Sequence, residues 1–328
     1  MNDANASPVA SKDFPMKWRG IDKFSGRQHA RGMVQPELRP ELRPKLRTQL
    51  RRVILCAALS LTVFPALSAN GASAVKRVQG LAPACASLGE MGKPGSRGVF
   101  LCRKGYALAF DVNAKVPLWV VENLTRERSL IFDKGRRRPF TQDPDLPPGT
   151  SPHNEDFRGG VYDKGHMAPA EDSDWDAEAS RETYYLSNVA PMVGRKLNRT
   201  LWKRLEEEVR NWAQCSNQLY VVTGPVLPAD LARAQRIGPS RLVVPTHFYK
   251  VVYQPATRRA AAFLVPNTEQ AGKEFERFAT SVDEVERRTG LDFLAALPDV
   301  LETEAEARVS STPWRITNRG LDCQLQAR

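Results

Sequence analysis

The sequence predicts an α+β domain, because strand and helix signals follow one another without a repeating order between about residues 80 and 300. Helical spacing of apolar residues predicts a helix after Asn198, and a capping box at Ser281 with a stop at Gly290 predicts another. Segments rich in β-branched or aromatic residues predict strands at 118–121, 219–223, 248–253 and 260–265. The irregular order argues against a doubly wound parallel sheet.

The composition is that of an ordinary soluble globular protein, with 41% hydrophobic and 26% charged residues in 328. Small disulfide scaffolds, collagen and long coiled coils are excluded. The net charge of +11 is typical of nucleic-acid binding. However, residues 1–74 hold 12 Lys and Arg against 5 Asp and Glu, so most of this excess lies outside the predicted domain. Arguments about partners therefore depend on local sites.

The N-terminal region has the pattern of a targeting segment. An apolar run over 53–67 follows two arginines and is too short to span a bilayer comfortably, and small residues at 72–74 fit a cleavage site. We therefore expect a disordered basic extension over 1–52, a signal peptide over 53–74 and a single domain over 75–328. The protein would be exported to the periplasm or the extracellular space, without membrane attachment after cleavage. A buried core helix and an uncleaved anchor are the alternatives.

The even number of cysteines after the predicted signal peptide fits export, because exported proteins commonly form disulfides. Cys56 would leave with the signal peptide, and the four remaining cysteines allow three pairings into two disulfides. Cys85 and Cys102 flank a short Gly- and Pro-containing stretch, so a local bridge between them is the simplest pairing. Cys215 would then pair with Cys323.

His166 has the most suggestive setting of the four histidines. The preceding Asp163, Lys164 and Gly165 place an acid, a cation and a small residue beside the imidazole, as a phosphodiester hydrolase would need. A hydrogen-bonded loop histidine is the alternative. Of the others, His29 lies in the leader, and we expect His153 in an exposed loop and His247 in a structural strand position.

An ordered set of motifs accompanies this histidine, at 163–166, 185–191, 197–198, 202, 204–206, 222–225, 244–251 and 280–291. The set resembles the DNA/RNA non-specific endonucleases, the ββα-metal nucleases that include bacterial secreted nucleases and endonuclease G. The resemblance covers about residues 105–300, the expected core. It implies a mixed, mainly antiparallel sheet with flanking helices and a ββα-metal active-site motif.

The resemblance implies that His166 is the general base and that Asn198 is the side chain that directly binds Mg²⁺, with Mn²⁺ or another divalent cation as alternatives. An amide oxygen suits this cation, which keeps several waters. Glu206 would hold a metal-bound water. The alternatives are a helix N-cap role for Asn198 and an exposed i,i+4 pair between Glu206 and Arg210.

Three cations complete the implied site. Arg138 matches an arginine that contacts the scissile phosphate, although Arg136 and Arg137 leave the alignment open by a residue or two. Lys164 stands where the family usually has arginine, which keeps the charge but loses the fork geometry. Arg210 matches a further functional arginine. Each could instead be an ordinary surface or loop charge.

We therefore expect a Mg²⁺-dependent endonuclease that cuts DNA and RNA without sugar specificity and leaves 5′-phosphates. It would bind both through the phosphate backbone, because no base-reading motif is present. The expected assembly is compatible with a homodimer and with a protein inhibitor. A catalytically silent nucleic-acid-binding paralogue and a structural envelope or interaction protein are the alternatives from other classes.

Overall fold

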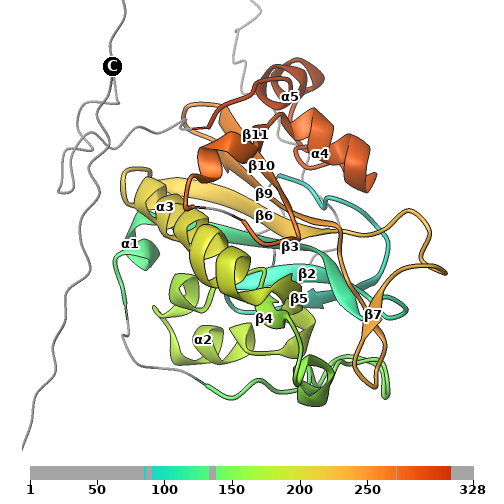
Figure 1. Cartoon of the computed structure of the whole chain (residues 1–328). Helices are drawn as coiled ribbons and strands as arrows, with labels where there is room; N and C mark the ends of the chain where they lie inside the picture. The colour runs from blue at the N-terminus through green and yellow to red at the C-terminus, as the bar shows by residue number, and fades with distance from the viewer. Residues whose placement is uncertain (1–84, 86–90, 133–137, 271, 312–328) are drawn as a thin grey trace, which may run out of the picture. The chain divides into compact units, whose positions relative to one another are not determined.

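The computed structural model describes residue 85 and residues 91–132, 138–270 and 272–311 (Figure 1). All of them fall within one compact unit, residues 69–328. The predicted extension over 1–52 and signal peptide over 53–74 lie outside the described residues. No helix in the described part of the chain is long and apolar enough to cross a membrane.

A seven-stranded antiparallel sheet forms the centre, in the order β1-β2-β3-β6-β9-β10-β11. Its strands are β1 (Val99–Cys102), β2 (Tyr106–Asp111), β3 (Val116–Thr125), β6 (Gln218–Val226), β9 (His247–Gln254), β10 (Arg259–Pro266) and β11 (Ala279–Thr280). The four predicted strands are confirmed as parts of β3, β6, β9 and β10. Two small antiparallel sheets pair β4 (Tyr162–His166) with β5 (Val189–Val193) and β7 (Arg236–Ile237) with β8 (Leu242–Val243).

Helices and short helical turns connect these strands. The helices are α1 (Arg126–Ser129), α2 (Ala177–Thr183), α3 (Lys203–Gln214), α4 (Val282–Thr289), α5 (Asp299–Glu306) and the π-helix η5 (Gly194–Trp202). The 3₁₀ turns are η2 (Asn154–Phe157), η3 (Ala170–Ser173), η4 (Leu186–Asn188) and η6 (Phe275–Phe278). The predicted α+β class with a mainly antiparallel sheet and flanking helices is confirmed.

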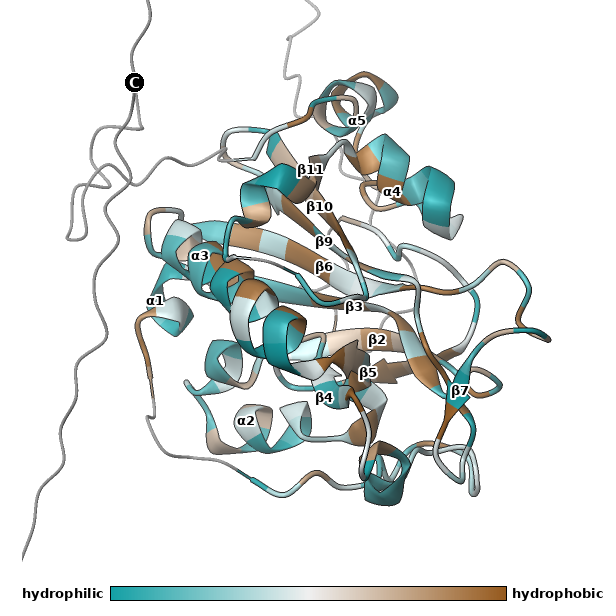
Figure 2. Ribbon diagram, in the orientation of Figure 1, coloured by the Kyte–Doolittle hydropathy of each residue, from teal (hydrophilic) through white to brown (hydrophobic). Residues whose placement is uncertain are grey.

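The two faces of the central sheet carry separate hydrophobic cores. One face packs on η5 and α3 through large buried side chains such as Trp202, Leu205 and Trp212. The other face packs on α4, α5 and the segment around Met91, where the ring of Phe293 packs against that of Tyr249. Because side chains alternate along each strand, the central strands supply apolar residues to both faces. Figure 2 shows hydrophobic residues, in brown, along these strands. The result is a sheet between two covering layers.

The predicted helix after Asn198 exists, but it begins earlier. The chain leaves β5 and enters η5 at Gly194, and η5 continues directly into α3. Asn198 therefore lies inside a helix rather than at an N-cap, because the N-cap position is taken by Val193. The spacing of apolar residues could not reveal that a π-helix precedes the regular α-helix. At the end of this π-helix, the Lys203 N–H donates to the Asn198 carbonyl, five residues earlier.

The helix predicted near Ser281 is confirmed as α4. The Ser281 side chain accepts a hydrogen bond from the Glu284 N–H at 3.2 Å. Gly290 ends the helix in the left-handed region at φ 69°, which a residue without Cβ adopts readily. The Glu284 carboxylate binds Arg287 and Arg288 instead of returning to the N-cap.

The predicted disulfide between Cys85 and Cys102 is present, with the two Cα atoms 5.9 Å apart. It ties residue 85 to the end of β1. Cys215 is also disulfide-bonded. Its predicted partner, Cys323, lies outside the described residues.

Candidate active site

The β4–β5 hairpin and the helix that follows it form a ββα unit, which the resemblance implied. In β4, Gly165 lies opposite Ala190 of β5. A Cβ at Gly165 would come within 2.6 Å of the Met192 Cβ, so the close approach of the two strands requires glycine before His166. The histidine is thereby held at the end of a tightly packed strand.

His166 lies against an aromatic wall. Its ring centroid is 5.1 Å from that of Phe140 and 5.5 Å from that of Tyr184, in an edge-on arrangement with the latter. Its Nε2 atom is buried and has no hydrogen-bond partner among the described residues. Burial lowers the pKa of His166 to about 4, and Glu171 opposes this only in part. The imidazole is therefore neutral at pH 7 and keeps one ring nitrogen unpaired.

Asn188 fixes the chain immediately after His166. The buried side chain accepts a hydrogen bond from the Ala168 N–H at 3.0 Å and donates to the carbonyls of Ala168 and Thr183, each at 2.9 Å. The Met167 N–H in turn donates to the Asn188 carbonyl. All these groups are satisfied within the protein, so Asn188 is a positioning residue for the segment that carries the histidine.

Asp163 connects Asn198 to the same strand. The Asn198 Nδ2 donates to Asp163 Oδ2 at 3.1 Å, and Arg199 donates twice to the same carboxylate, at 2.6 and 2.7 Å. Although burial alone would raise it, these hydrogen bonds lower the pKa of Asp163. An ionised carboxylate only accepts hydrogen bonds, so it selects the NH₂ end of the Asn198 amide and leaves the amide oxygen for another partner.

Asp163 precedes His166 by only three residues, so either this carboxylate or a backbone carbonyl could orient the imidazole. The structure directs the carboxylate elsewhere, because residues alternate along β4 and Asp163 faces the helix that carries Asn198 and Arg199. Gly194 is part of this arrangement: a Cβ there would lie 2.8 Å from the Asp163 carboxylate. The glycine that opens η5 thus makes room for the contact.

Lys164 and His166 share the other side of β4. The Lys164 Nζ lies 5.3 Å from the centre of the Phe140 ring and 5.2 Å from that of Phe157. Arg138 is two residues before Phe140, and its Nε is buried without a hydrogen-bond partner among the described residues. The structure thus connects Lys164, His166 and the Arg138 segment through Phe140. Arg136 and Arg137 lie outside the described residues.

Glu206 and Arg210 are not an exposed pair, contrary to the alternative considered from sequence. Arg210 is only 5% exposed, and its Nε donates to the buried Asp172 carboxylate at 2.7 Å while Nη2 lies 3.8 Å from Glu171. Burial raises the pKa of Glu206 to about 8, although Lys250 opposes the shift. Arg210 is therefore buried in α3, and Glu206 is half-buried beside it.

A buried cluster of charges lies between α3 and the central sheet, and sequence analysis did not identify it. Glu122 on β3 and Lys250 on β9 point to the α3 side, where they interact electrostatically with Asp172, Glu206 and Arg210. The Lys250 Nζ also donates to the Thr223 hydroxyl at 2.6 Å and lies 5.2 Å from the Trp202 ring. The sequence offered one signal for this cluster, because Glu122 and Lys250 are charged residues inside mainly apolar strands.

Replacement of Lys250 by methionine is expected to destabilise the fold by about 3–5 kcal/mol, because it removes one of the two cations, Lys250 and Arg210, that compensate the buried carboxylates. The measurement is urea unfolding at pH 7. The matched control is Lys203→Met, which removes an exposed lysine that reaches Glu207 at 3.9 Å and should change stability by no more than about 0.5 kcal/mol. Equal effects of the two variants would show that the cluster does not need Lys250.

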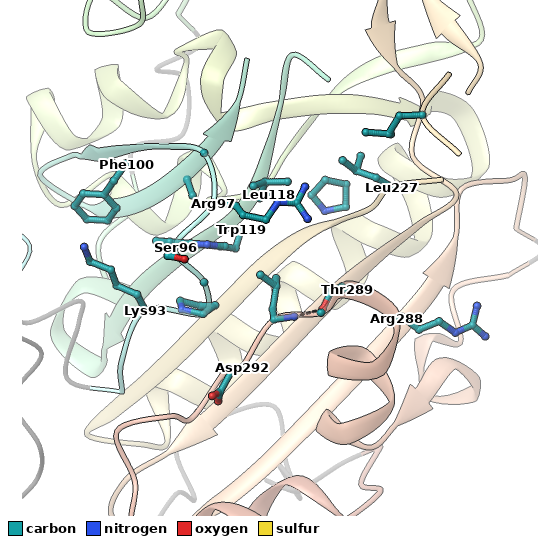
Figure 3. A pocket seen from close by; sticks show the side chains of 18 of the residues that line it. Lys93, Ser96, Arg97, Phe100, Leu118, Trp119, Leu227, Arg288, Thr289 and Asp292 are labelled. Atoms are coloured by element: carbon teal, nitrogen blue, oxygen red, sulfur yellow. Dashed lines mark hydrogen bonds between the residues drawn. The ribbon is translucent and has the colours of Figure 1, made fainter. Parts of the chain in front are cut away.

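A well-formed pocket elsewhere on the protein is not part of this site. It has a volume of about 710 Å³ and lies against the opposite face of the sheet, with Phe100, Trp119, Leu118 and Thr289 among its lining residues (Figure 3). None of the predicted catalytic residues lines it. The pocket and the candidate active site are therefore separate features of the fold.

A ββα unit with a half-buried, neutral histidine, an oriented asparagine and adjacent cations is the arrangement expected of a nuclease. The sequence profile described as "DNA/RNA non-specific endonuclease" matches residues 86–300, and the chain belongs to this family. It is 34% identical over 255 residues to the mitochondrial endonuclease G of Bos taurus, covering 74% of this chain and 83% of that protein. Nuclease 1, mitochondrial, of Schizosaccharomyces pombe is 35% identical over 226 residues, covering 64% and 70%.

The fold comparison agrees. A structure described as an EndoG/EndoGI complex that explains EndoG inhibition aligns with a TM-score of 0.61 at 30% identity. It covers 67% of this chain and 94% of that chain. The predicted family and the predicted nuclease activity are therefore confirmed.

The predicted export is wrong. Relatives from Schizosaccharomyces pombe, Danio rerio and Bos taurus are all named mitochondrial nucleases, which contradicts a periplasmic or extracellular location and gives no support to a signal peptide. The physical reason for the error is that arginine-rich N-terminal sequences are common to mitochondrial transit peptides and to the charged start of signal peptides. Composition alone did not separate the two.

Proposed function

We propose that the protein is a Mg²⁺-dependent endonuclease that hydrolyses phosphodiester bonds in both DNA and RNA and leaves 5′-phosphates. The observation that carries this proposal is the unpaired, buried Nε2 of a neutral His166. A neutral imidazole with an unpaired nitrogen can accept the proton of an attacking water at neutral pH. The cation of Lys164, which shares the Phe140 surface with His166, supports a phosphate as the group under attack.

The donor set fits a hydrated Mg²⁺. Asn198 would hold the cation through its amide oxygen, since Asp163 already accepts from the amide nitrogen. Glu206 would accept hydrogen bonds from a water of that cation, and a nearby divalent charge favours its ionised form over the protonated one. When bound, the cation would supply Lewis-acid stabilisation of the charge that develops on the phosphate oxygens. Mn²⁺ or another divalent ion is an alternative with similar ligands.

The remaining residues divide into two groups. Lys164 and Arg138 would contact substrate phosphates, with the Arg138 guanidinium suited to two oxygens at once. Arg210 would instead position Glu206, because its own hydrogen bond and ion pair go to Asp172 and Glu171. Binding through phosphates predicts affinity that falls with salt and depends little on base sequence.

The location and partners are proposed from the relatives. Their names support a mitochondrial protein, and the arginine-rich N-terminal sequence is consistent with import. The structurally similar EndoG is inhibited in its complex with EndoGI, which supports regulation of this chain by a protein inhibitor. The extent of the domain, residues 75–328, and a homodimer stay predictions.

Incubation of the purified full-length chain with supercoiled plasmid and Mg²⁺ is expected to give nicked and linear forms, and single-stranded RNA should be degraded under the same conditions. Excess EDTA should abolish both reactions and renewed Mg²⁺ should restore them. Phosphatase-sensitive 5′ ends on the fragments would support the proposed products. Digestion of linear DNA with intact closed circles would contradict endonuclease action, and cleavage in EDTA would contradict metal dependence.

A further inference from the structure

Five carboxylates gather between α4 and α5, on the face of the central sheet opposite His166. Carboxylate oxygens of Asp283, Glu286 and Glu306 all lie within 4.8 Å of one another. The same holds for Asp292, Glu302 and Glu306. Glu306 is common to both groups, so it stands at the centre of the cluster.

Burial and the neighbouring carboxylates raise the pKa of Glu306 to about 8, and no nearby lysine or arginine compensates the cluster in the described part of the chain. Among the described residues, none of the five carboxylates forms a salt bridge with lysine or arginine. The nearby arginines of α4, Arg287 and Arg288, are both held by Glu284. Glu286 accepts a hydrogen bond from the Phe293 N–H at 2.8 Å, and its side chain also forms a hydrogen bond with that of Glu306. Bringing carboxylates this close without a cation is unfavourable.

Glu306 provides an independent indication of a missing partner. It is only 6% exposed, and its Oε1 is buried without a hydrogen-bond partner among the described residues. A buried carboxylate oxygen normally accepts a hydrogen bond or binds a cation, because losing water without compensation costs free energy. Of the five, it is the side chain least able to turn toward solvent.

We propose that this cluster, with Glu306 as its central ligand, binds one Ca²⁺ ion. Calcium takes six to eight oxygen ligands at about 2.3–2.6 Å, so ligand atoms around one ion are separated by at most about 5 Å, as they are within each group of three that includes Glu306. Mg²⁺ fits less well, because it requires strict octahedral geometry and usually binds one or two carboxylates. The exposed Asp283 and Asp292 leave a path for the ion to enter.

Such an ion would connect α4 to α5 and to the loop that carries Asp292. These elements cover the second core of the sheet through Val282, Val285 and Ala305. Calcium would therefore stabilise the folded state without taking part in the nuclease reaction. The competing explanation of the cluster is a proton shared between Glu286 and Glu306.

The test uses full-length protein carrying Asn198→Ala, so that the proposed catalytic metal site does not contribute, after removal of metals with a chelator. Titration with CaCl₂ at pH 7.5 is followed by calorimetry and by the unfolding temperature. We expect one bound Ca²⁺ per chain and a rise in unfolding temperature. Adding Glu306→Gln should weaken binding by at least about tenfold and remove the rise, because the central charged ligand is lost. It should also raise the unfolding temperature without calcium, since like-charge repulsion is relieved.

The matched control is Glu304→Gln, which removes an exposed carboxylate of the same helix that pairs with Arg308. Its calcium affinity should stay within about twofold of the parent, because it is no ligand. If Glu306→Gln does not fold, the exposed pair Asp283→Asn and Asp292→Asn must give the tenfold loss. Absence of calcium binding in the parent overturns the proposal and favours the shared proton. Unchanged affinity in the Glu306 variant, or in the exposed double variant, overturns it as well.

Discussion

Replacement of His166 by alanine is expected to lower the rate of plasmid cleavage by about 100- to 10,000-fold, the usual loss on removal of a general base. Mg²⁺ binding should remain nearly intact, because Asn198 is held by Asp163 and not by the imidazole. The rate is measured at saturating Mg²⁺, and metal binding is measured separately by titration.

The matched control is His153→Ala. This exposed histidine contacts Gln142 at the surface of a loop, so its removal should leave the rate within about twofold of the wild type. Retention of more than about a tenth of the wild-type rate by His166→Ala would contradict the assignment of the base. An equal loss in both variants would point to an effect on folding instead.

The pH profile tests the same residue through its protonation. The base acts only when neutral, and the pKa of His166 lies near 4 in place of the usual value near 6.5, so the acid limb should be displaced to lower pH. At saturating Mg²⁺ the enzyme should therefore keep most of its activity at about pH 5.5, where a free imidazole would be largely protonated. A midpoint near pH 6.5 would contradict the burial argument. Persistence of an unchanged acid limb in His166→Ala would assign that limb to another group.

Replacement of Asn198 by alanine is expected to raise the Mg²⁺ concentration needed for half-maximal cleavage by more than about tenfold, because the amide oxygen is the proposed direct protein ligand. Cleavage at low Mg²⁺ should be almost lost, and part of it should return at high Mg²⁺. The measurement is the cleavage rate as a function of Mg²⁺ concentration.

Asn211→Ala is the matched control, since Asn211 lies on α3 and its side chain contacts Glu208, at 3.5 Å, away from the proposed metal ligand. Its Mg²⁺ dependence should equal that of the wild type. A lower maximal rate for Asn198→Ala with an unchanged Mg²⁺ midpoint would argue that this side chain acts on substrate or structure and does not hold the metal.

The sequence predicted the α+β fold class and the positions of four central strands, because both depend on the local pattern of residues. Strands β3, β6, β9 and β10 were predicted from segments rich in β-branched or aromatic residues, and α4 was predicted from Ser281 and Gly290. The hairpin of β4 and β5 was not predicted as strands. Its sequence contains Gly165 and Pro191, which have low strand propensity, and pairing between distant segments overrides that preference.

The candidate site was likewise predicted only in part. The sequence indicated His166, Lys164, Asn198 and Glu206 through short ordered motifs, but it could not show what each side chain contacts. Asp163 turned out to bind Asn198 and not the histidine, because alternation in β4 directs it to the other side. The location was misjudged because signal peptides and mitochondrial transit peptides both have basic N-terminal sequences, and composition alone did not separate them.

The amino-acid sequence by itself determined which chemical groups are present and, through hydrophobic periodicity, which segments form the sheet and its helices. Only the tertiary structure decided their electrostatic environment. Glu122 and Lys250 are far apart in the sequence and meet Glu206 across the interface between the sheet and α3. Burial there controls charge, because a pKa depends on solvent and on neighbours in space, and these are properties of the packed chain and not of local sequence.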